Sequence, residues 1–371
     1  EVGLDMPMSI NVSRKTGPFY SVNNKTLNVL TFHHSPIYAP VVLPKNTIRF
    51  HMTKRTMEPI ISNAAASLYE LEGDLRLLEF HSKANALTGA SMEIVAAAAK
   101  NHGKGIIVHN DAQHFSAGVD LNRFRAFIEA EDWAGIDAFL NDFQQAVKAL
   151  KYTPVPVIGA PSGLSIGGGF EVLAHCDKLV AHTNTVFGLV ETGVGVVPGG
   201  GGVKETLWRW FQATGDWEKA SWNTWMQIGY GQIGTSPDLS SRMQYYLKDR
   251  DIEVLNRDKL MHVAIAEVAK LQKEYMPPSI PVFELPGCAI LSKMSNFMQK
   301  GIDDGLFYPH DKIVAMQVAE IVVNGSSDNS LTVSEQDMYD RERRAFLVLA
   351  KTPKTIVRIS SLLDTGEAIR N

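Results

Sequence analysis

The pattern of apolar and polar positions changes twice along the chain. Residues 1 to about 60 show no sustained period of either kind and are broken by prolines, as in HHSPIYAPVVLPKN. Such a stretch predicts a connector with short extended pieces. From about residue 64 the positions alternate, and residues 67–72 and 75–80 flank a Gly73-Asp74 pair. This arrangement predicts a β-hairpin.

The central part of the chain alternates between strand-like and helix-like runs. Short apolar runs at residues 105–110 and 155–160 are typical of buried parallel strands. Residues 91–101 are rich in alanine, and residues 133–150 carry apolar side chains at helical spacing. Strands alternating with helices in this way predict an α/β fold.

Beyond about residue 204 the pattern is helical. Helices are predicted at residues 258–275, 288–301, 310–324 and 334–350, with prolines between 277 and 286. We therefore expect three parts: an N-terminal connector (1–62), a catalytic domain (63–270) and an all-helical C-terminal region (271–371). Five of the six tryptophans lie between Trp208 and Trp225. Core packing is the expected role of these tryptophans, with the lining of an acyl tunnel as the alternative.

Composition and charge exclude several classes of function. The chain of 371 residues is 45% hydrophobic and has a net charge of -4, so it lacks the basic surface needed for nucleic acid or an anionic membrane. No apolar run approaches the roughly 20 residues that span a bilayer, and no secretory signal is visible. Two cysteines, Cys176 and Cys288, predict reduced thiols in a cytoplasmic enzyme. Because the sequence begins with Glu1, we expect a fragment or a processed product.

Residues 154–202 carry the strongest chemical signal in the chain. An apolar run leads into the triplet of residues 167–169, Glu171 follows at once, and Glu191 stands 20 residues later in the frame FGLVE. A glycine-rich turn that opens a helix exposes unpaired backbone N–H groups at the positive end of the helix dipole. Two carboxylates beside such donors predict proton transfer next to a polarised carbonyl.

An oxyanion hole needs two converging donors. Gly168 can bring its N–H close to a ligand because it has no side chain. The second candidate is Val119 in the segment HFSAGVDL, where Gly118 bends the chain after a predicted strand. Each motif is weak alone, since a glycine triplet is common in packing and a glutamate early in a helix is a favourable dipole partner. Their combination predicts a catalytic site.

These segments resemble the crotonase superfamily, and within it the enoyl-CoA hydratases. The resemblance covers about residues 75–205, including SKANALT, HFSAGVDL, PVIGAPSGLSIGGGFEVLAHCD and VFGLVETGVGVVPGGGG. It implies a spiral of β-β-α units, followed here by the helical region, and a CoA thioester substrate. It also implies residue roles: oxyanion donors Val119 and Gly168, Glu191 for the α-carbon, Glu171 for the water, Gly199 for positioning that water, and Lys83, Ala117 and Leu121 for CoA.

The flanking segments resemble bacterial polypeptides in which a 3-hydroxyacyl-CoA dehydrogenase precedes the hydratase. The likeness lies in GPFY and in the tail SEQDMYDRERRAFLVLAKTPKTIVRISSLLDTGEAIRN. It implies that the chain is the hydratase portion, that a dehydrogenase domain is its partner, and that NAD belongs to that domain. Crotonase relatives are often trimers, so a homo-oligomer is also expected.

No cofactor or metal is expected in the chain itself. Gly193 and Gly195 resemble a dinucleotide fingerprint, but Pro198 stands where its third glycine belongs. The histidines, among them His102 and His109, lack metal-ligand spacing with cysteine or carboxylate partners. For His175, which follows Glu171 on its helix, packing or a hydrogen bond is the expected role.

Three functions stay open at this point. The first is hydration of trans-2-enoyl-CoA in fatty-acid β-oxidation, which uses both glutamates. The second is Δ3,Δ2-enoyl-CoA isomerisation, which needs one carboxylate and no bound water. The third is a non-catalytic module that binds CoA thioesters and docks a dehydrogenase through the helical region. The presence of Glu171 and Glu191 together favours hydration.

Overall fold

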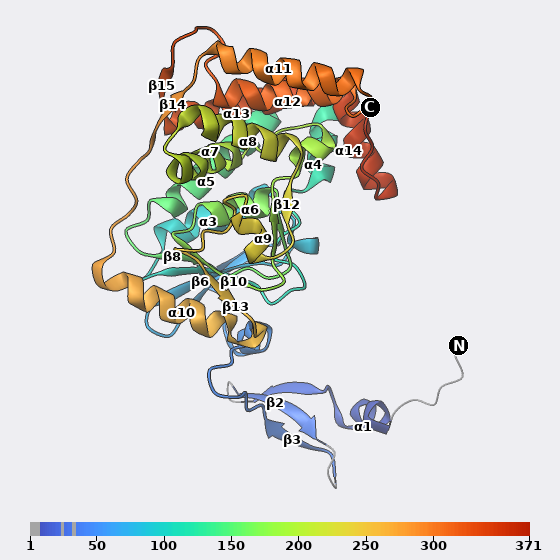
Figure 1. Cartoon of the computed structure of the whole chain (residues 1–371). Coiled ribbons are helices and arrows are strands. Elements are labelled where there is room, and N and C mark those ends of the chain that lie inside the picture. Colours follow the sequence, from blue (N-terminus) through green and yellow to red (C-terminus); the bar gives the residue numbers. More distant parts are fainter. Residues whose placement is uncertain (1–7, 24–25, 32–34) are drawn as a thin grey trace.

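A small antiparallel sheet lies in the N-terminal part of the chain. The computed structural model describes residues 8–23, 26–31 and 35–371, so parts of the predicted connector lie outside it. The described part contains a helix, three strands and two short helices: α1 (Met8–Thr16), β1 (Tyr20–Asn23), β2 (Thr26–Thr31), β3 (Ile37–Pro40), α2 (Phe50–Thr53) and η1 (Lys54–Thr56). Figure 1 shows this sheet below the main body of the molecule.

A seven-stranded sheet forms the centre of the molecule, in the order β13-β10-β8-β7-β6-β5-β4. Its strands are β4 (Ile61–Ser62), β5 (Ala66–Leu71), β6 (Leu75–Phe80), β7 (Ile106–Val108), β8 (Val157–Gly159), β10 (Lys178–His182) and β13 (Ile252–Val254). Strands β5 and β6 form the predicted hairpin, in which Gly73 and Asp74 have positive φ. From β6 onward the neighbouring strands are parallel.

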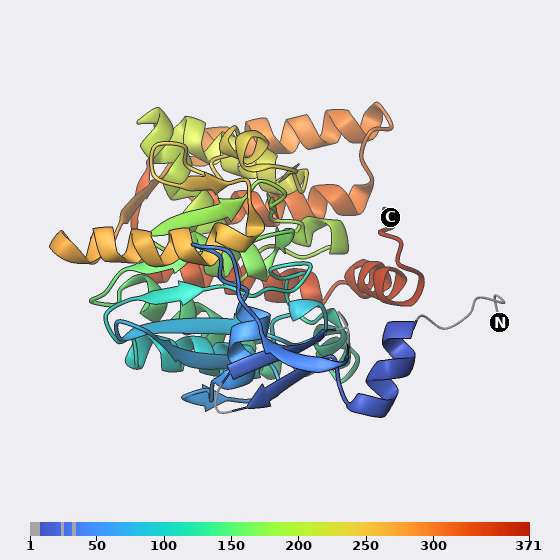
Figure 2. The ribbon, with the colours of Figure 1, turned by 90° about the horizontal axis from the view of Figure 1, so that it is seen from below.

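Helices cover both faces of this sheet. Along β7, Ile106 and Val108 point into the core shared with α3 (Gly89–Lys100) and α5 (Trp133–Lys151), while Ile107 points to the other face. That other face packs on α10 (Leu260–Leu271) through Ala264 and Val268. Figure 2 shows α10 lying across the sheet. Burial on both sides explains why these strands are apolar runs without alternation.

A second, smaller sheet positions the predicted glutamates. It consists of β9 (Leu164–Ile166), β11 (Val186–Gly188) and β12 (Ile233–Gly234), with β9 and β11 parallel. Strand β9 leads into α6 (Gly168–Ala174), and β11 leads into the short helix η3 (Glu191–Val194). Because β9 and β11 are parallel neighbours, their carboxyl ends bring the starts of α6 and η3 together.

The later helices pack mainly on one another, and single helices among them contact α5 and the second sheet (Figure 1). They are α7 (Gly202–Thr214), α8 (Trp217–Gly229), α9 (Pro237–Ser241), α11 (Cys288–Asp303), α12 (Pro309–Val322), α13 (Glu335–Ala350) and α14 (Pro353–Thr365). The remaining short helices are η2 (Lys83–Asn85), α4 (Leu121–Glu129), η4 (Arg257–Lys259) and η5 (Gln272–Glu274). Apolar side chains of α11, α12 and α13 belong to the same core as the strands.

The helical region also contains a two-stranded sheet that the sequence did not predict. Strand β14 (Val282–Leu285) pairs antiparallel with β15 (Leu331–Ser334). Each strand is only four residues long, too short for a period to be recognised. The predicted domain limits at residues 62 and 270 stay predictions. None of the helices that the structure describes is long and apolar enough to cross a membrane.

Candidate active site

Glu171 lies in the first turn of α6 and is almost completely buried, with 2% of its surface exposed. Its Oε1 accepts hydrogen bonds from the backbone N–H groups of Gly200, at 2.7 Å, and Gly202, at 2.8 Å. These donors belong to the glycine segment of residues 199–202, which opens α7. The carboxylate of Glu171 therefore satisfies N–H groups that a helix start leaves unpaired.

The segment of residues 199–202, here called the glycine loop, must be glycine where it touches Glu171. A Cβ at Gly202 would lie 2.9 Å from Oε1 of Glu171, and one at Gly200 would lie 2.7 Å from Oε2. Both distances are shorter than ordinary van der Waals contact. The backbone can thus approach the carboxylate only because neither residue carries a side chain.

Glu191 begins η3, shortly after the end of β11 at Gly188. Its Oε2 is buried and has no hydrogen-bond partner among the described residues. Its Oε1 faces the helix start of α6, where a Cβ at Gly167 would lie 3.1 Å away. A buried carboxylate oxygen without a partner is rare in proteins and points to a functional site.

The two carboxylates hold protons more tightly than ordinary glutamates. Burial raises the pKa of Glu171 to about 7, against the opposing effect of the two loop N–H groups. Burial, followed by the negative charge of Glu171, raises the pKa of Glu191 to about 8. Two acids that repel each other in a dry site share protons, so near neutral pH one member can be charged while the other is protonated.

A cleft of about 310 Å³ contains Glu191 and four of the other predicted residues: Ala117, Val119, Leu121 and Gly168. The segment before Val119 is anchored by Ser116, whose Oγ donates to the carbonyl of Asn85 at 2.8 Å. Ser116 also pairs with Ser165 of β9 in a parallel bridge. These contacts hold the 114–121 segment against the second sheet.

Val119 and Gly168 lie side by side in this cleft. A Cβ at Gly168 would lie 2.9 Å from Cγ1 of Val119. In the part of the chain that the structure describes, neither backbone N–H of these two residues donates to a protein acceptor. Two free N–H groups in one cleft have the arrangement that an oxyanion hole requires, although the role itself stays a prediction.

The other predicted residues lie at different distances from the cleft. Gly199 is buried behind it, where its carbonyl accepts from Gln144 at 2.7 Å and a Cβ would meet Leu140 at 2.8 Å. The glycine N–H groups bound to Glu171 are those of Gly200 and Gly202, so the water-positioning role of Gly199 stays a prediction. Lys83 is exposed, and the neighbouring Ala84 accepts a hydrogen bond from the N–H of Ala117 at 3.3 Å.

Sequence reasoning missed the residues of α13 that reach this site. Glu342 binds the glycine loop, and Tyr339 contacts His175, as described below. Both side chains lie on the apolar stripe of α13, with Met338, Ala345 and Phe346. A charged residue inside an apolar stripe is a signal of a buried, paired carboxylate, and it was visible in the sequence.

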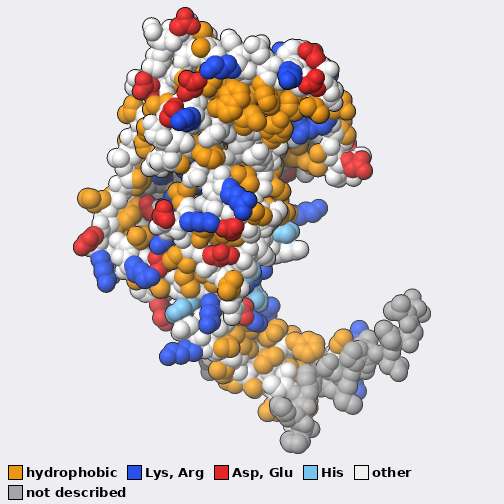
Figure 3. Space-filling model, viewed as in Figure 1, with side chains coloured by type: hydrophobic (Ala, Val, Ile, Leu, Met, Phe, Trp, Pro, Cys, Tyr) orange, Lys and Arg blue, Asp and Glu red, His pale blue; other side chains and the backbone are white. Residues whose placement is uncertain are grey.

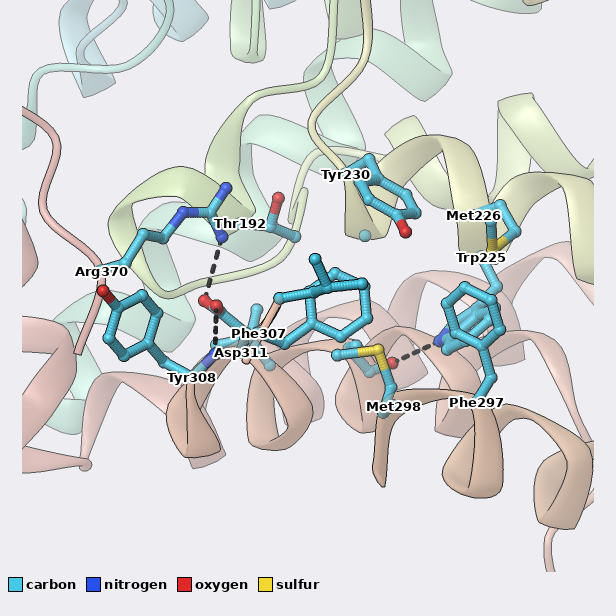
Figure 4. A pocket seen from close by; sticks show the side chains of 14 residues that line it. Thr192, Trp225, Met226, Tyr230, Phe297, Met298, Phe307, Tyr308, Asp311 and Arg370 are labelled. Carbon is cyan, nitrogen blue, oxygen red and sulfur yellow. Dashed lines mark hydrogen bonds and ion pairs between the residues drawn. The ribbon is translucent and has the colours of Figure 1, made fainter. Parts of the chain in front are cut away.

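An apolar cavity of about 200 Å³ lies next to the cleft, and Tyr230 and Arg370 line both. In Figure 4, Arg370, Asp311 and Tyr308 occupy one end of it, Trp225, Met226 and Phe297 occupy the other, and Phe307 stands between them. Three residues that line the cavity, Tyr230, Leu306 and Tyr308, are 45%, 72% and 51% exposed. Figure 3 shows a patch of apolar side chains on the upper part of the molecule. The tryptophan cluster thus serves packing in part, while Trp225 also lines a cavity.

Within the described residues, no three histidine, cysteine, aspartate or glutamate side chains lie close enough to hold a metal ion. Cys176 is buried and Cys288 is partly exposed, and both are free thiols.

Known proteins similar to this chain share its central region. The family model described as enoyl-CoA hydratase/isomerase matches residues 78–213. A Bacillus subtilis protein named a probable 3-hydroxyacyl-CoA dehydrogenase is 28% identical over 377 residues, covering 100% of this chain and 47% of the relative. The fatty acid oxidation complex subunit alpha of Idiomarina loihiensis is 33% identical over 99 residues, covering 27% of this chain and 14% of that protein.

The chain therefore spans about half, or less, of the length of these curated relatives. Among solved structures, an enoyl-CoA hydratase from Bacillus halodurans superposes with a TM-score of 0.56 at 15% identity, covering 80% of this chain and 100% of that one. At this identity the likeness concerns the fold alone, and it agrees with the predicted β-β-α spiral. The residues that match the enoyl-CoA hydratase/isomerase family model, 78–213, include both glutamates of the site.

Proposed function

We propose that this chain is an enoyl-CoA hydratase, which adds water across the C2–C3 double bond of a trans-2-enoyl-CoA to give a 3-hydroxyacyl-CoA. The observation that carries the proposal is a pair of glutamates with raised pKa values, buried Glu171 and Glu191 with its buried Oε2, beside two free N–H groups. A single carboxylate would be enough to move a proton. Two carboxylates that differ in protonation can take one proton from water and give another to carbon.

The thioester carbonyl is the group that the free N–H groups of Val119 and Gly168 would bind. Attack of water at C3 moves negative charge onto the carbonyl oxygen as an enolate. Donors already aimed at that oxygen stabilise the enolate more than the ground-state carbonyl, and losing one typically costs about 3–4 kcal/mol. The position of Gly168 at the start of α6 adds the positive end of the helix dipole.

The two glutamates then complete the addition. Charged Glu171 accepts a proton from the water as its oxygen bonds to C3, and protonated Glu191 gives its proton to C2 of the enolate. The product carries one hydroxyl and one new C–H bond, and the reverse steps restore the alkene. The unpartnered Oε2 of Glu191 supports this assignment, because the substrate would supply the partner that the protein does not.

The two adjoining cavities are where the acyl-CoA would bind. We propose that the CoA part binds along Ala117 and Leu121, with Lys83 near its entry, and that the acyl chain extends past Tyr230 into the apolar cavity. Hydration needs neither redox cofactor nor metal. NAD would belong to a 3-hydroxyacyl-CoA dehydrogenase acting on the product, a partner that the names of the relatives support, and the pathway would be fatty-acid β-oxidation. A cytoplasmic location and a homo-oligomer stay predictions.

Isomerisation is the second candidate function, and one observation favours it. Glu191 lines the cleft, whereas Glu171 is buried behind it and already bound by two N–H groups. Moving a proton between C4 and C2 of a 3-enoyl-CoA needs only one such accessible carboxylate. A non-catalytic module that docks a dehydrogenase through the helical region is disfavoured. Helix α13 of that region contacts the glycine loop and so forms part of the candidate site.

The test compares two reactions in one protein. Purified chain is assayed with crotonyl-CoA for hydration and with a 3-enoyl-CoA for isomerisation, alongside Glu171→Gln. The control is Glu267→Gln, which alters a buried carboxylate of α10 paired with Lys178 on the far face of the main sheet. We expect Glu171→Gln to lower hydration by about 10²-fold or more and to spare isomerisation. Absence of hydration by the unaltered chain would refute the hydratase proposal.

A further inference from the structure

Two carboxylates from different helices bind alternate N–H groups of the glycine loop. Glu171 of α6 accepts from Gly200 and Gly202, whereas Oε2 of Glu342 on α13 accepts from Gly201 at 2.7 Å. The second oxygen of Glu342 accepts from the N–H of Lys204 at 2.8 Å. Glu171 and Glu342 together thus bind the glycine loop and the first turn of α7.

Glu342 is the hydrogen-bond acceptor for the backbone N–H groups of Gly201 and Lys204. The side chain has no exposed surface, so water cannot take over its hydrogen bonds. Gly201 adopts φ +102°, a conformation open to glycine, and a Cβ there would lie 2.8 Å from ring atoms of Tyr339 and His175. Helix α13 therefore lies directly against the loop, and the loop is shaped to receive it.

A second chain of hydrogen bonds runs from α13 to Glu171. The Tyr339 hydroxyl and Nε2 of His175 are 2.9 Å apart, and Nδ1 of His175 lies 2.6 Å from the backbone carbonyl of Glu171. A carbonyl only accepts, so Nδ1 carries the proton, and Nε2 accepts from the Tyr339 hydroxyl. Burial holds the pKa of His175 well below its ordinary value, which fits this neutral form.

We propose that Glu342 is a positioning residue for the reaction at Glu171, holding the glycine loop so that the N–H groups of Gly200 and Gly202 point at the Glu171 carboxylate. The inference rests on the proposed function, since it concerns how the water-activating acid is kept in place. It makes the C-terminal helical region part of the catalytic unit, although that region lies outside the matched residues 78–213.

Loss of Glu342 should affect one step of the reaction, water activation, and spare the other, proton transfer at C2. The two loop N–H groups favour the charged form of Glu171, against its burial. Without them Glu171 would hold its proton and lose its orientation, and water activation would fail. Proton transfer at C2 uses Glu191 and the free N–H groups of Val119 and Gly168, none of which Glu342 touches. Loss of Glu342 should therefore lower hydration and leave α-proton transfer.

The experiment compares Glu342→Gln with Glu335→Gln in the full chain. Glu335 lies on the same helix, is 1% exposed and binds the side chains of Lys204 and Tyr152, but it does not contact the glycine loop. Three quantities are measured: kcat and KM for hydration of crotonyl-CoA, the rate of deuterium exchange at C2 of butyryl-CoA, and the amide proton shifts of Gly200 and Gly202 by NMR. Thermal unfolding of each variant is recorded alongside.

We expect Glu342→Gln to lower kcat for hydration at least about 10-fold, with KM and C2 exchange within about twofold of the unaltered chain. The Gly200 and Gly202 amide protons should move upfield as their bonds to Glu171 lengthen. Glu335→Gln should change none of these, whatever it does to thermal stability. Equal losses of hydration and exchange in Glu342→Gln, or unmoved glycine amides, would overturn the proposal.

Two further outcomes are kept distinct. If Glu342→Gln does not fold, Glu342→Asp takes its place, since it keeps the carboxyl group and draws it back by one methylene. The same loss of hydration with retained exchange is then expected. If the unaltered chain does not hydrate crotonyl-CoA, the proposed function fails, while the glycine amide shifts still decide whether Glu342 holds the loop against Glu171.

Discussion

Arg370 and Asp311 form an ion pair of 2.9 Å beside the catalytic cleft, and Arg370 lines both the cleft and the apolar cavity. Asp311 is also bound by the fully buried Arg358 at 2.8 Å, so it stays fixed when Arg370 moves. The Arg370 side chain is 45% exposed, and exposed ion pairs contribute little stability. The acyl chain of the proposed substrate would therefore displace Arg370 at small cost to enter the cavity.

The cavity should set the preference for acyl chain length. Gly229 ends α8 at the cavity wall, its φ suits any residue, and a Cβ there would meet no atom within 4 Å. We expect Gly229→Leu to fill this space, leaving kcat/KM for a C4 enoyl-CoA within about twofold and lowering it about 10-fold or more for C10 and longer chains, since one or two lost methylene contacts change binding by about 1–3 kcal/mol.

The control for this prediction is Gly89→Leu. Gly89 begins α3, and its Cβ would likewise point into open space, but Gly89 is exposed and lines neither cavity. A series from C4 to C16 should have the same profile in Gly89→Leu and in the unaltered chain. A Gly229→Leu profile that keeps long-chain activity would show that the acyl chain lies elsewhere.

The raised pKa values predict a bell-shaped pH profile. Glu171 must be charged to accept a proton from water, so kcat/KM should fall as the pH drops below about 7. Glu191 must be protonated to give a proton to C2, so kcat/KM should fall as the pH rises above about 8. The two apparent pKa values of the profile belong to the coupled pair of glutamates and not to either acid alone. Initial rates with crotonyl-CoA across this range, in buffers of constant ionic strength, test the prediction, and a flat profile contradicts it.

The close approach of Val119 to Gly168 predicts that a substitution at Val119 will restore activity lost by a substitution at Gly168. Gly168→Ala would place a Cβ 2.9 Å from Cγ1 of Val119, pushing apart the two proposed oxyanion donors. We expect this variant to lose about 10²-fold in kcat, the usual cost of one donor. Val119→Ala removes the methyl group in conflict, so Val119→Ala/Gly168→Ala should recover at least about 10-fold over Gly168→Ala. Purely additive losses in the double variant would mean that the two residues do not act together.

How much the sequence could predict depended on how far apart the interacting residues lie along the chain. Gly168, Glu171 and Glu191 stand close together among punctuating glycines, so their pattern was readable, and the β5–β6 hairpin followed from local alternation. Glu342 binds Gly201 across 141 positions. A glutamate in an apolar stripe predicts burial, but no local pattern names its partner. The packing of α13 on the loop follows from the tertiary fold.

The short strands β14 and β15 could not be predicted for a different reason. Strands β14 and β15 pair across a helical hairpin, and only Phe283, Leu285 and Val333 of their residues are buried. With so few buried positions the period is not visible, and pairing with a distant strand decides the structure. The sequence could not predict the apolar cavity either, because its walls come from α8, α11, α12 and the penultimate residue Arg370.

Removing the charge of Glu191 should stabilise the protein at alkaline pH. Its pKa is raised from the ordinary 4.5 to about 8, so the folded chain binds a proton that the unfolded chain releases. The folded state is therefore favoured below about pH 4.5, and this contribution is lost as the pH rises towards about 8.

Glu191→Gln cannot ionise and avoids the loss. Its melting temperature should exceed that of the unaltered chain by a few degrees at about pH 8.5, with the difference shrinking towards about pH 5, because each kcal/mol shifts Tm by roughly 2–4 °C in domains of about 150–250 residues and by less in a longer chain. Thermal unfolding followed by circular dichroism across this range measures the difference, and a gap that does not vary with pH would show that Glu191 is an ordinary, solvated carboxylate.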